Sequence, residues 1–333
     1  MRGITRFGGN SALVSLLSAD VGTRTAQPLP TQGVLLRYRI PIILVVFAVF
    51  AAAPAAASAS EMISRNATHV HLAVNRNNVA LLTYQSEGRL HHTLAWGAVN
   101  ARTPTRGMKQ VSFRLDYSGG WGSRRKDVWR GFKNACGPYD GPELSYVVAA
   151  CKAPDGSYWV VQKWRRLLPP FGLVPTFAQR AVEMHLSHWS GDLPEFVVKV
   201  DWVYERYDHL YGWLTYKGKG VYGFKATKYG AALDTWGRNV FVDTYDSRYG
   251  RGWKRENGFL THRGSGAFCY AFYPHGNRPI GKGSEYRATV MGPGVIPILF
   301  WQGAAPGPYD AAVDDVANQE QRALFTNAKC RHK

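Results

Sequence analysis

The stretch from Asp234 to His262 holds the densest mixture of aromatic, charged and amide side chains in this sequence. Planar rings stack on the C–H faces of sugars, and Asn, Asp and Arg hydrogen-bond sugar hydroxyls, so this composition indicates a ligand site. The predicted ligand-binding residues are Trp236, Arg238, Asn239, Tyr245, Tyr249, Trp253, Arg255, Asn257 and His262. The alternative is a turn-rich stretch whose rings belong to the core and whose charges pair with each other.

Two carboxylates in the same stretch are candidates for glycan hydrolysis. That reaction needs a pair of carboxylates about 5 to 10 Å apart across the scissile bond. The pair to consider is Asp243 or Asp246 together with Glu256. Structural carboxylates are far commoner than catalytic ones, so the alternative is that all three serve the fold.

Three histidine pairs have spacings that raise the question of a metal site: His69 with His71, His91 with His92, and His185 with His188. Residues two apart on a strand share a face, as in sites with two histidine ligands, but a zinc site also needs third and fourth ligands. No H-E-x-x-H or H-x-x-E-H signature supplies them. We therefore predict no metal and no cofactor, with these imidazoles partly buried or on the surface.

Rings and cations alternate in a second stretch, residues 121–133. Its members are Trp121, Arg124, Arg125, Lys126, Trp129, Arg130, Phe132 and Lys133. Such a stretch can follow an anionic polymer, with the rings adding stacking contacts. The alternative is a solvated loop anchored by its tryptophans. Because no run of Lys and Arg exceeds three residues, we expect no specific nucleic-acid partner.

An apolar run extends from Ile40 to Ala57. Two arginines, Arg37 and Arg39, precede it, and the small-residue tripeptide Ala57-Ser58-Ala59 ends it. This order is typical of a secretory signal peptide. We predict a signal over residues 34–59, with translation starting near Val34 and residues 1–33 a non-native or disordered extension. Membrane contact is expected only in the alternative, in which the segment is an uncleaved anchor. Either way the protein is secreted or extracellular.

Charge and size set limits on the exported part, residues 60–333. Removing residues 1–59 takes away five arginines and one aspartate, which leaves 36 basic and 22 acidic side chains, a net charge of +14. This charge favours association with polyanions such as wall polymers. The alternative is basicity that serves only solubility. About 270 residues are enough for one large β domain.

Four cysteines, all in the exported part, form an even set suited to disulfides in an oxidising compartment. Three pairings are possible. We favour Cys136 with Cys151, which closes a short loop, and Cys269 with Cys330, which ties down the C-terminal tail.

Alternating apolar and polar residues with Gly and Pro turns predict about fifteen short strands. The predicted ranges are 69–75, 79–84, 89–96, 111–117, 145–151, 157–164, 182–189, 195–203, 210–216, 221–225, 240–245, 259–262, 267–273, 285–291 and 295–301. This spacing is typical of an antiparallel sandwich or a barrel-like domain. We treat residues 60–333 as one mainly β, disulfide-stabilised domain.

Helix is expected chiefly at the C-terminus, from Asp310 to Lys329. Asp310 can cap the N-terminus, and acidic residues suit the first turn. The predicted apolar stripe is narrow and consists of Val313, Val316, Glu320, Leu324 and Ala328. A second short helix is predicted from Asp127 to Ala135.

Three strings are similar to a family of secreted actinobacterial proteins to which no activity is assigned. They are Leu94 to Asn100 (LAWGAVN), Ala153 to Trp159 (APDGSYW) and Gly252 to His262 (GWKRENGFLTH). The resemblance covers most of the chain after about His69. It implies export, a bacterial source and the late translation start, and it brings no catalytic residues.

The favoured function is therefore non-catalytic binding of a cell-envelope or environmental polymer, either a glycan or an anionic polymer. One alternative is an extracellular glycan-active hydrolase that uses the Asp/Glu pair. The other is a structural surface protein whose aromatic residues serve only the core.

Overall fold

A computed structural model of the chain describes residues 60–100, 111–165, 180–220, 225–226, 232–233, 240–255, 259–262, 266–271, 283–291 and 297–326. Contacts between Cα atoms group Ala55–Lys333 into one compact unit. The predicted extension (1–33) and signal segment (34–59) lie outside the described residues. Within the ranges given above, no helix has the length and apolar character needed to cross a membrane.

Two antiparallel sheets pack face to face in the first half of this unit. Sheet A has the spatial order β1 (Glu61–Arg65), β8 (Val182–Trp189), β7 (Tyr158–Arg165) and β6 (Val147–Lys152). Sheet B has the order β2 (Thr68–Val74), β3 (Ala80–Ser86), β4 (Arg89–Gly97) and β5 (Phe113–Asp116). Fully buried side chains from both sheets, among them Leu82, Ala95, Trp159 and Leu186, form one core. This is the packing of a β-sandwich.

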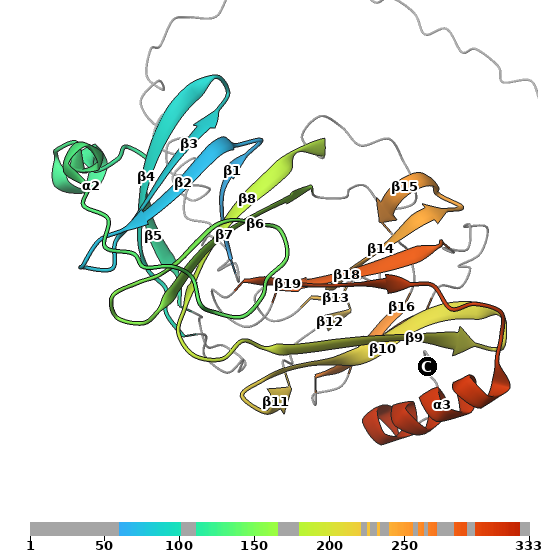
Figure 1. Cartoon of the computed structure of the whole chain (residues 1–333). Helices are drawn as coiled ribbons and strands as arrows, with labels where there is room; N and C mark the ends of the chain where they lie inside the picture. The colour runs from blue at the N-terminus through green and yellow to red at the C-terminus, as the bar shows by residue number, and fades with distance from the viewer. Residues whose placement is uncertain are drawn as a thin grey trace, which may run out of the picture. The chain divides into compact units, whose positions relative to one another are not determined.

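A second pair of sheets follows along the chain (Figure 1). Sheet C has the order β15 (Gly250–Arg255), β14 (Val240–Ser247), β18 (Glu285–Met291) and β19 (Ile298–Ala304). Sheet D contains β11 (Lys219–Gly220), β10 (Tyr207–Tyr216), β17 (Ala267–Ala271) and β16 (Phe259–His262), with β9 (Glu195–Val203) also paired to β10. A short pair is formed by β12 (Lys225–Ala226) and β13 (Ala232–Leu233). Val242 and Tyr286 of sheet C share a core with Leu210 of sheet D and Trp189 of sheet A.

The mainly β fold with a C-terminal helix is confirmed, and its hairpin turns explain the register. Between β3 and β4, Glu87 and Gly88 have φ values of 52° and 73°. Between β10 and β11, Lys217 and Gly218 have φ values of 52° and 69°. Two successive positive φ angles define the type I′ turn, whose twist matches that of antiparallel strands, and glycine adopts the second position without strain.

Helix α3 (Ala311–Phe325) begins where the sequence predicts. Asp310 Oδ1 accepts hydrogen bonds from the backbone N–H groups of Ala312 (2.9 Å) and Val313 (3.2 Å). The predicted apolar stripe is wrong in part, because Val313 and Val316 are exposed. The buried residues are Asp314, Ala317, Gln321 and Phe325.

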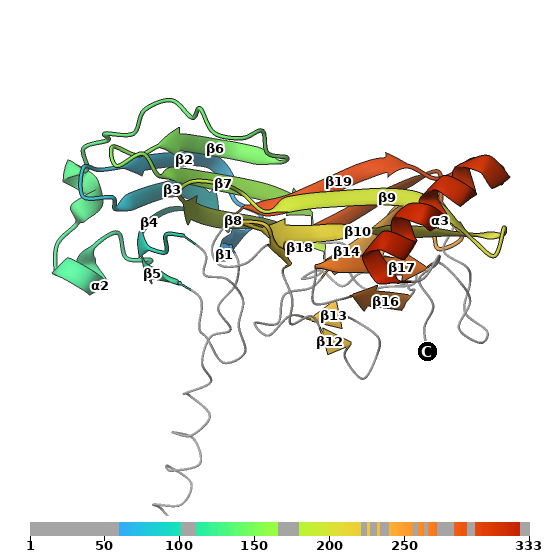
Figure 2. The ribbon, with the colours of Figure 1, turned by 90° about the horizontal axis from the view of Figure 1, so that it is seen from below.

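Polar contacts explain why the buried face of α3 is turned from the predicted one. Gln321 Nε2 donates to Asp201 Oδ2 of β9 (2.9 Å), and Glu320 pairs with Lys199 (2.6 Å). Figure 2 shows α3 lying across β9 and β10. Because the sheet presents charged and other polar side chains to the helix, hydrogen bonding decides which face is buried.

The helix predicted over Asp127 to Ala135 is wrong in extent. Within that range only a 3₁₀ turn, η1 (Val128–Gly131), forms, and a single α-helical turn, α2 (Trp121–Arg124), precedes it. Val128, Trp129 and Phe132 pack on a cluster that includes Leu81 and Leu94 of sheet B. Tertiary contact with the outer face of that sheet therefore fixes the segment.

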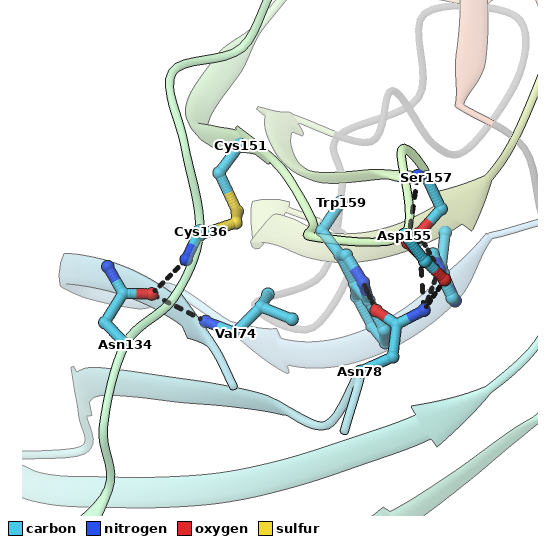
Figure 3. Close-up of a disulfide and its surroundings, with 9 residues drawn as sticks. Val74, Asn78, Asn134, Cys136, Cys151, Asp155, Ser157 and Trp159 are labelled. Carbon is cyan, nitrogen blue, oxygen red and sulfur yellow. Dashed lines mark hydrogen bonds between the residues drawn. A yellow bond between two sulfur atoms is a disulfide. The ribbon is translucent and has the colours of Figure 1, made fainter. Parts of the chain in front are cut away.

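The predicted Cys136–Cys151 disulfide is present, with its Cα atoms 5.8 Å apart (Figure 3). Asn134 Oδ1 accepts from the backbone N–H of Cys136 (3.1 Å) and of Val74 (3.0 Å), which ties this segment to β2. Cys269 is also disulfide-bonded. Its predicted partner, Cys330, lies outside the described residues. Disulfide bonding is compatible with an extracellular protein.

A partly buried polar network joins sheets A and B beside this disulfide. The Asn78 side chain accepts from Trp159 Nε1 (2.8 Å) and donates to Asp155 Oδ2 (2.5 Å), as Figure 3 shows. His188 Nε2 lies 2.8 Å from Ser157 Oγ, and His188 Nδ1 donates to the Gly97 carbonyl (2.8 Å). The network therefore links the β2–β3 turn, the β6–β7 turn, β8 and the end of β4.

Candidate functional site

Four of the predicted ligand or catalytic residues lie on one face of sheet C. Asp243 pairs in register with Arg255, and Tyr245 pairs with Trp253. Directly opposed residues of antiparallel strands point to the same side, and residues two apart share that side. Val242 points to the opposite side, into the core. These four residues are therefore neighbours on the face of sheet C that is turned away from the core.

Asp243 is 1 % exposed and both of its oxygens are bound by arginines. Arg255 Nε lies 2.6 Å from Oδ1, and Arg287 NH2 lies 3.2 Å from Oδ2. A carboxylate held in this way matches a structural ion pair better than a nucleophile or a proton donor. Its predicted partner, Glu256, lies outside the described residues, so the catalytic pair stays a prediction.

Of the remaining predicted residues, Asp246 and Tyr249 are described and do not join this group. Asp246 is exposed and accepts a hydrogen bond from the backbone N–H of Gly252 (2.6 Å), so it stabilises the β14–β15 turn. Tyr249 is buried. His262 belongs to β16, but its side chain is not described. The residues outside the described part of the chain are Trp236, Arg238, Asn239, Glu256 and Asn257.

A pocket of about 510 Å³ lies at the edge of sheet B, between β5 and α2. Its lining residues are Trp96, Leu115, Asp116, Tyr117, Ser118, Gly122 and Ser123. The Tyr117 ring is 55 % exposed, so it is available to a ligand. The volume lies within the range of small-molecule sites in proteins. We call this site the β5–α2 pocket.

Asp116 is a fixed anion that shapes the floor of the β5–α2 pocket. Burial raises its pKa, but hydrogen bonds from Ser118 and Ser123 outweigh this effect and bring the pKa to about 2. Both serines donate through the hydroxyl and the backbone N–H, so the carboxylate accepts four hydrogen bonds. Such a group cannot act as a general acid near neutral pH. Its role here is to hold the turn before α2.

Basic residues border the β5–α2 pocket on two sides. Arg114 is exposed and pairs in register with Trp96, so its side chain lies on the same face of sheet B. Beyond Ser123, the chain continues with the exposed residues Arg124, Arg125 and Lys126. Residues 121–133, which we call the basic segment, contain five cations and one acid, a net charge of +4.

The basic segment is held by aromatic contacts. The rings of Trp129 and His92 are stacked with centroids 4.1 Å apart, and the Arg130 guanidinium lies 4.6 Å from the Trp129 ring centroid. Burial and the nearby charges of Arg130 and His91 lower the pKa of His92, so its imidazole is neutral at pH 7. Trp129 therefore holds the basic segment against sheet B, and the cations of the segment are exposed to solvent.

No protein-family model, curated protein or solved structure matches the chain. Within the described residues, no three His, Cys, Asp or Glu side chains come together in a group suited to a metal ion. The function must therefore be argued from the pocket itself. Among its lining residues Asp116 is the one carboxylate, and its oxygens already accept four hydrogen bonds. The arrangement is equipped to bind a ligand through rings and cations.

Sequence reasoning found the basic segment but missed Trp96, Tyr117 and Arg114, which place a pocket beside it. On the sequence Trp96 and Tyr117 end two predicted strands and are 21 positions apart. The signal for their proximity is that consecutive strands pair as neighbours in most sheets. Register between these strands, which places Arg114 opposite Trp96, comes only from the structure.

Proposed function

We propose that the protein binds an anionic extracellular polymer at the β5–α2 pocket and along the basic segment, without catalysing a reaction. The observation that carries this proposal is the combination of a ring-lined pocket with a fixed segment of net charge +4. Rings supply stacking area, and cations attract phosphate, sulfate or carboxylate groups over long range.

An acidic glycan is the favoured class of polymer. The lining contains Trp96 and Tyr117, whose rings can stack on sugar faces, and its volume suits a sugar ring with part of its neighbour. A polymer that carries one charge per sugar would place its next acidic groups along the cations from Arg124 to Lys133. An extracellular location of the protein agrees with this proposal, because wall and matrix polymers are extracellular.

The first test removes a ring from the pocket. We expect Tyr117→Ala to weaken binding of alginate oligosaccharides about 5- to 150-fold, because stacking on an aromatic ring contributes about 1 to 3 kcal/mol. The free energy of unfolding should change little, since Tyr117 is 55 % exposed. Calorimetric titration measures the affinity, and urea unfolding measures the stability.

The matched control is Tyr204→Ala, which removes a 59 % exposed tyrosine from the β9–β10 turn. It should leave alginate affinity unchanged. Equal losses in the two variants would contradict a specific site at the β5–α2 pocket.

The second test concerns the charges of the basic segment. For three cation contacts, we expect the affinity for alginate to fall on the order of 20-fold between 50 and 200 mM NaCl. The double variant Arg124→Gln/Lys126→Gln should bind more weakly at low salt and show a shallower salt dependence. Repeating the titration at four salt concentrations gives the slope.

Two comparisons make this test decisive. Lys219→Gln removes an exposed cation from the β10–β11 hairpin and should leave the slope unchanged. A neutral glucan of equal length should bind much more weakly than alginate. A salt-independent affinity would exclude a polyanion ligand, and preference for single-stranded DNA over alginate would exclude an acidic glycan.

A further inference from the structure

The free edge of sheet B opens onto the β5–α2 pocket. In the strand order of this sheet, β5 is the last strand and pairs on one side only, with β4. The edge strand of a sheet leaves part of its backbone N–H and C=O groups without a partner in the ladder. The register of the β4–β5 pair determines which of these groups face outward.

Hydrogen bonding to β4 alternates along β5. The Ala98 N–H donates to the Ser112 carbonyl (3.0 Å), which fixes the phase of the ladder. In an antiparallel pair, hydrogen-bonded and non-hydrogen-bonded positions alternate, so Arg114 is hydrogen-bonded to β4 and Leu115 is not. The N–H and C=O of Leu115 therefore point away from β4. Neither group has a hydrogen-bond partner among the described residues.

Leu115 borders the pocket through this backbone edge. Its side chain packs on the core between sheets A and B, on the same side of sheet B as the buried Ala95. Trp96 and Asp116, which also line the pocket, follow these two residues in sequence and so lie on the opposite face of the sheet. The pocket therefore extends around the edge of sheet B, where the N–H and C=O of Leu115 are located.

The carboxylate and the Ser118 hydroxyl on the pocket floor already have partners. Asp116 accepts four hydrogen bonds, and Ser118 Oγ donates to Asp116 and accepts from the Gly122 N–H (2.5 Å). Leu115, by contrast, keeps both a donor and an acceptor for a ligand. Backbone groups that line a pocket fix the orientation of a ligand and provide specificity.

The two free groups belong to one extended residue, so they lie side by side and point in the same direction. A ligand that satisfies both must place an acceptor next to a donor. Two neighbouring sugar hydroxyls do this, because one accepts from the N–H while the other donates to the C=O. A carboxylate accepts from the N–H but offers no donor to the C=O. An acetamido group reaches only one of them, because the N–H and C=O of a trans amide point in opposite directions.

A strand of a partner protein also offers a donor next to an acceptor. Pairing with such a strand needs a long edge, however, and β5 has only four residues. The exposed ring of Tyr117 in the lining also suits the flat face of a sugar. The combination of one free backbone pair and one ring therefore favours a sugar over a peptide.

We infer that the free edge of β5 makes the β5–α2 pocket specific for acidic glycans with two unsubstituted neighbouring hydroxyls, and that Leu115 is the specificity-determining residue. This inference rests on the proposed function of the pocket. In a 1→4-linked uronic acid polymer, the O2 and O3 hydroxyls of each sugar are free to bind Leu115. The carboxylates of the polymer remain available to Arg114 and to the basic segment.

The first test changes the ligand. Alginate is a 1→4-linked uronic acid polymer, and acetylation of its O2 and O3 hydroxyls removes the donors while leaving the charge unchanged. We expect acetylated alginate oligosaccharides to bind about 5- to 150-fold more weakly than unmodified ones of the same length, because two hydrogen bonds are lost. Calorimetric titration at constant ionic strength measures both affinities.

The second test follows the Leu115 amide itself. In the free protein this unpaired N–H should exchange rapidly with solvent, whereas the Arg114 N–H is protected by its hydrogen bond to β4. Saturation with unmodified alginate should slow exchange at Leu115 at least tenfold and leave exchange at Arg114 unchanged. Nuclear magnetic resonance measures the two rates in the same sample.

A pair of variants assigns the preference to the backbone. Leu115→Pro removes the N–H at an outward-facing position of an edge strand, where sheets tolerate proline, and should weaken alginate binding about 2- to 12-fold. Leu115→Val is the matched control, because it changes the side chain and keeps the N–H, so it should bind alginate like the wild type. If Leu115→Pro does not fold, amide exchange in the wild type decides.

Equal affinity for acetylated and unmodified alginate would overturn the inference, and so would an unchanged exchange rate of the Leu115 amide at saturation. Both outcomes leave the proposed function intact, because alginate still binds. Absence of alginate binding would overturn the proposed function together with the inference. Oligoglutamate that protects the Leu115 amide as strongly as alginate would also overturn the inference, because the edge would then pair with an acidic peptide.

Discussion

Replacing Asp243 by asparagine is expected to lower the free energy of unfolding by about 3 to 5 kcal/mol. The substitution keeps the shape of the side chain and removes its charge, so Arg255 and Arg287 both lose their ion pair with Asp243. Breaking a buried ion pair by removing one partner is costly because the remaining charge keeps its desolvation penalty. Urea unfolding of the wild type and the variant, in a buffer without phosphate or sulfate, measures the difference.

Asp246→Asn is the matched control, because Asp246 lies three residues away and is exposed. It should cost at most about 1 kcal/mol, the contribution of one turn hydrogen bond. If Asp243→Asn were as mild as Asp246→Asn, the pairing of Asp243 with the two arginines would not be a stabilising buried ion network.

The strands and their turns could be predicted from the sequence because the signals are local. Alternation places one face of a strand in a core, and Glu87-Gly88 and Lys217-Gly218 adopt the two positive φ angles that join neighbouring strands. Four strands were not predicted, and two of them, β11 and β13, have only two residues each. In β15 (Gly250–Arg255), three basic residues and two glycines hide the alternation, and β1 (Glu61–Arg65) is short and half-buried.

Long-range pairing explains the remaining differences. The buried face of α3 is determined by contacts with Asp201 and Lys199, which lie more than 100 residues away along the chain. The sequence pattern of the helix alone does not predict these contacts. In the same way, Arg287 contacts Asp243 because the two residues are directly opposed in the β14–β18 pair. The sequence shows which residues are charged, but the pairing of distant strands determines which of them form ion pairs.

The two candidate sites differ in what the sequence could say about them. Asp243, Tyr245, Trp253 and Arg255 were grouped because they are close in sequence, and the hairpin of β14 and β15 keeps them close in space. The β5–α2 pocket combines residues from a strand end, a turn and a neighbouring strand. Its polar floor arises from the hydrogen bonds of Asp116, which depend on the fold of the Ser118–Ser123 turn.

Acid is expected to weaken the protein through His188, whose imidazole is 1 % exposed and stacks on Trp159 with ring centroids 3.8 Å apart. Burial lowers its pKa to about 4, and the hydrogen bond to the Gly97 carbonyl and the charge of Asp155 offset only part of this effect. In the unfolded chain the pKa is about 6.5, so the unfolded state takes up a proton first as the pH falls.

The stability that neutral His188 provides is therefore fully present above about pH 6.5 and is lost as the pH falls to about 4. The difference between the two pKa values corresponds to about 3 kcal/mol. Urea unfolding at pH 7.5, 5.5 and 4 measures the loss. In His188→Asn the difference between pH 7.5 and pH 4 should be smaller by that amount, while the stability at pH 7.5 is reduced.

His71→Asn is the control, because His71 lies exposed on β2 and should leave the pH dependence unchanged. The acid effect should also be local at first, because His188 contacts Ser157 in the β6–β7 turn and Gly97 at the end of β4. Amide exchange near pH 4 should therefore increase first where sheets A and B meet, and later in sheets C and D. An equal pH dependence in His188→Asn and the wild type would place the acid sensitivity elsewhere in the molecule.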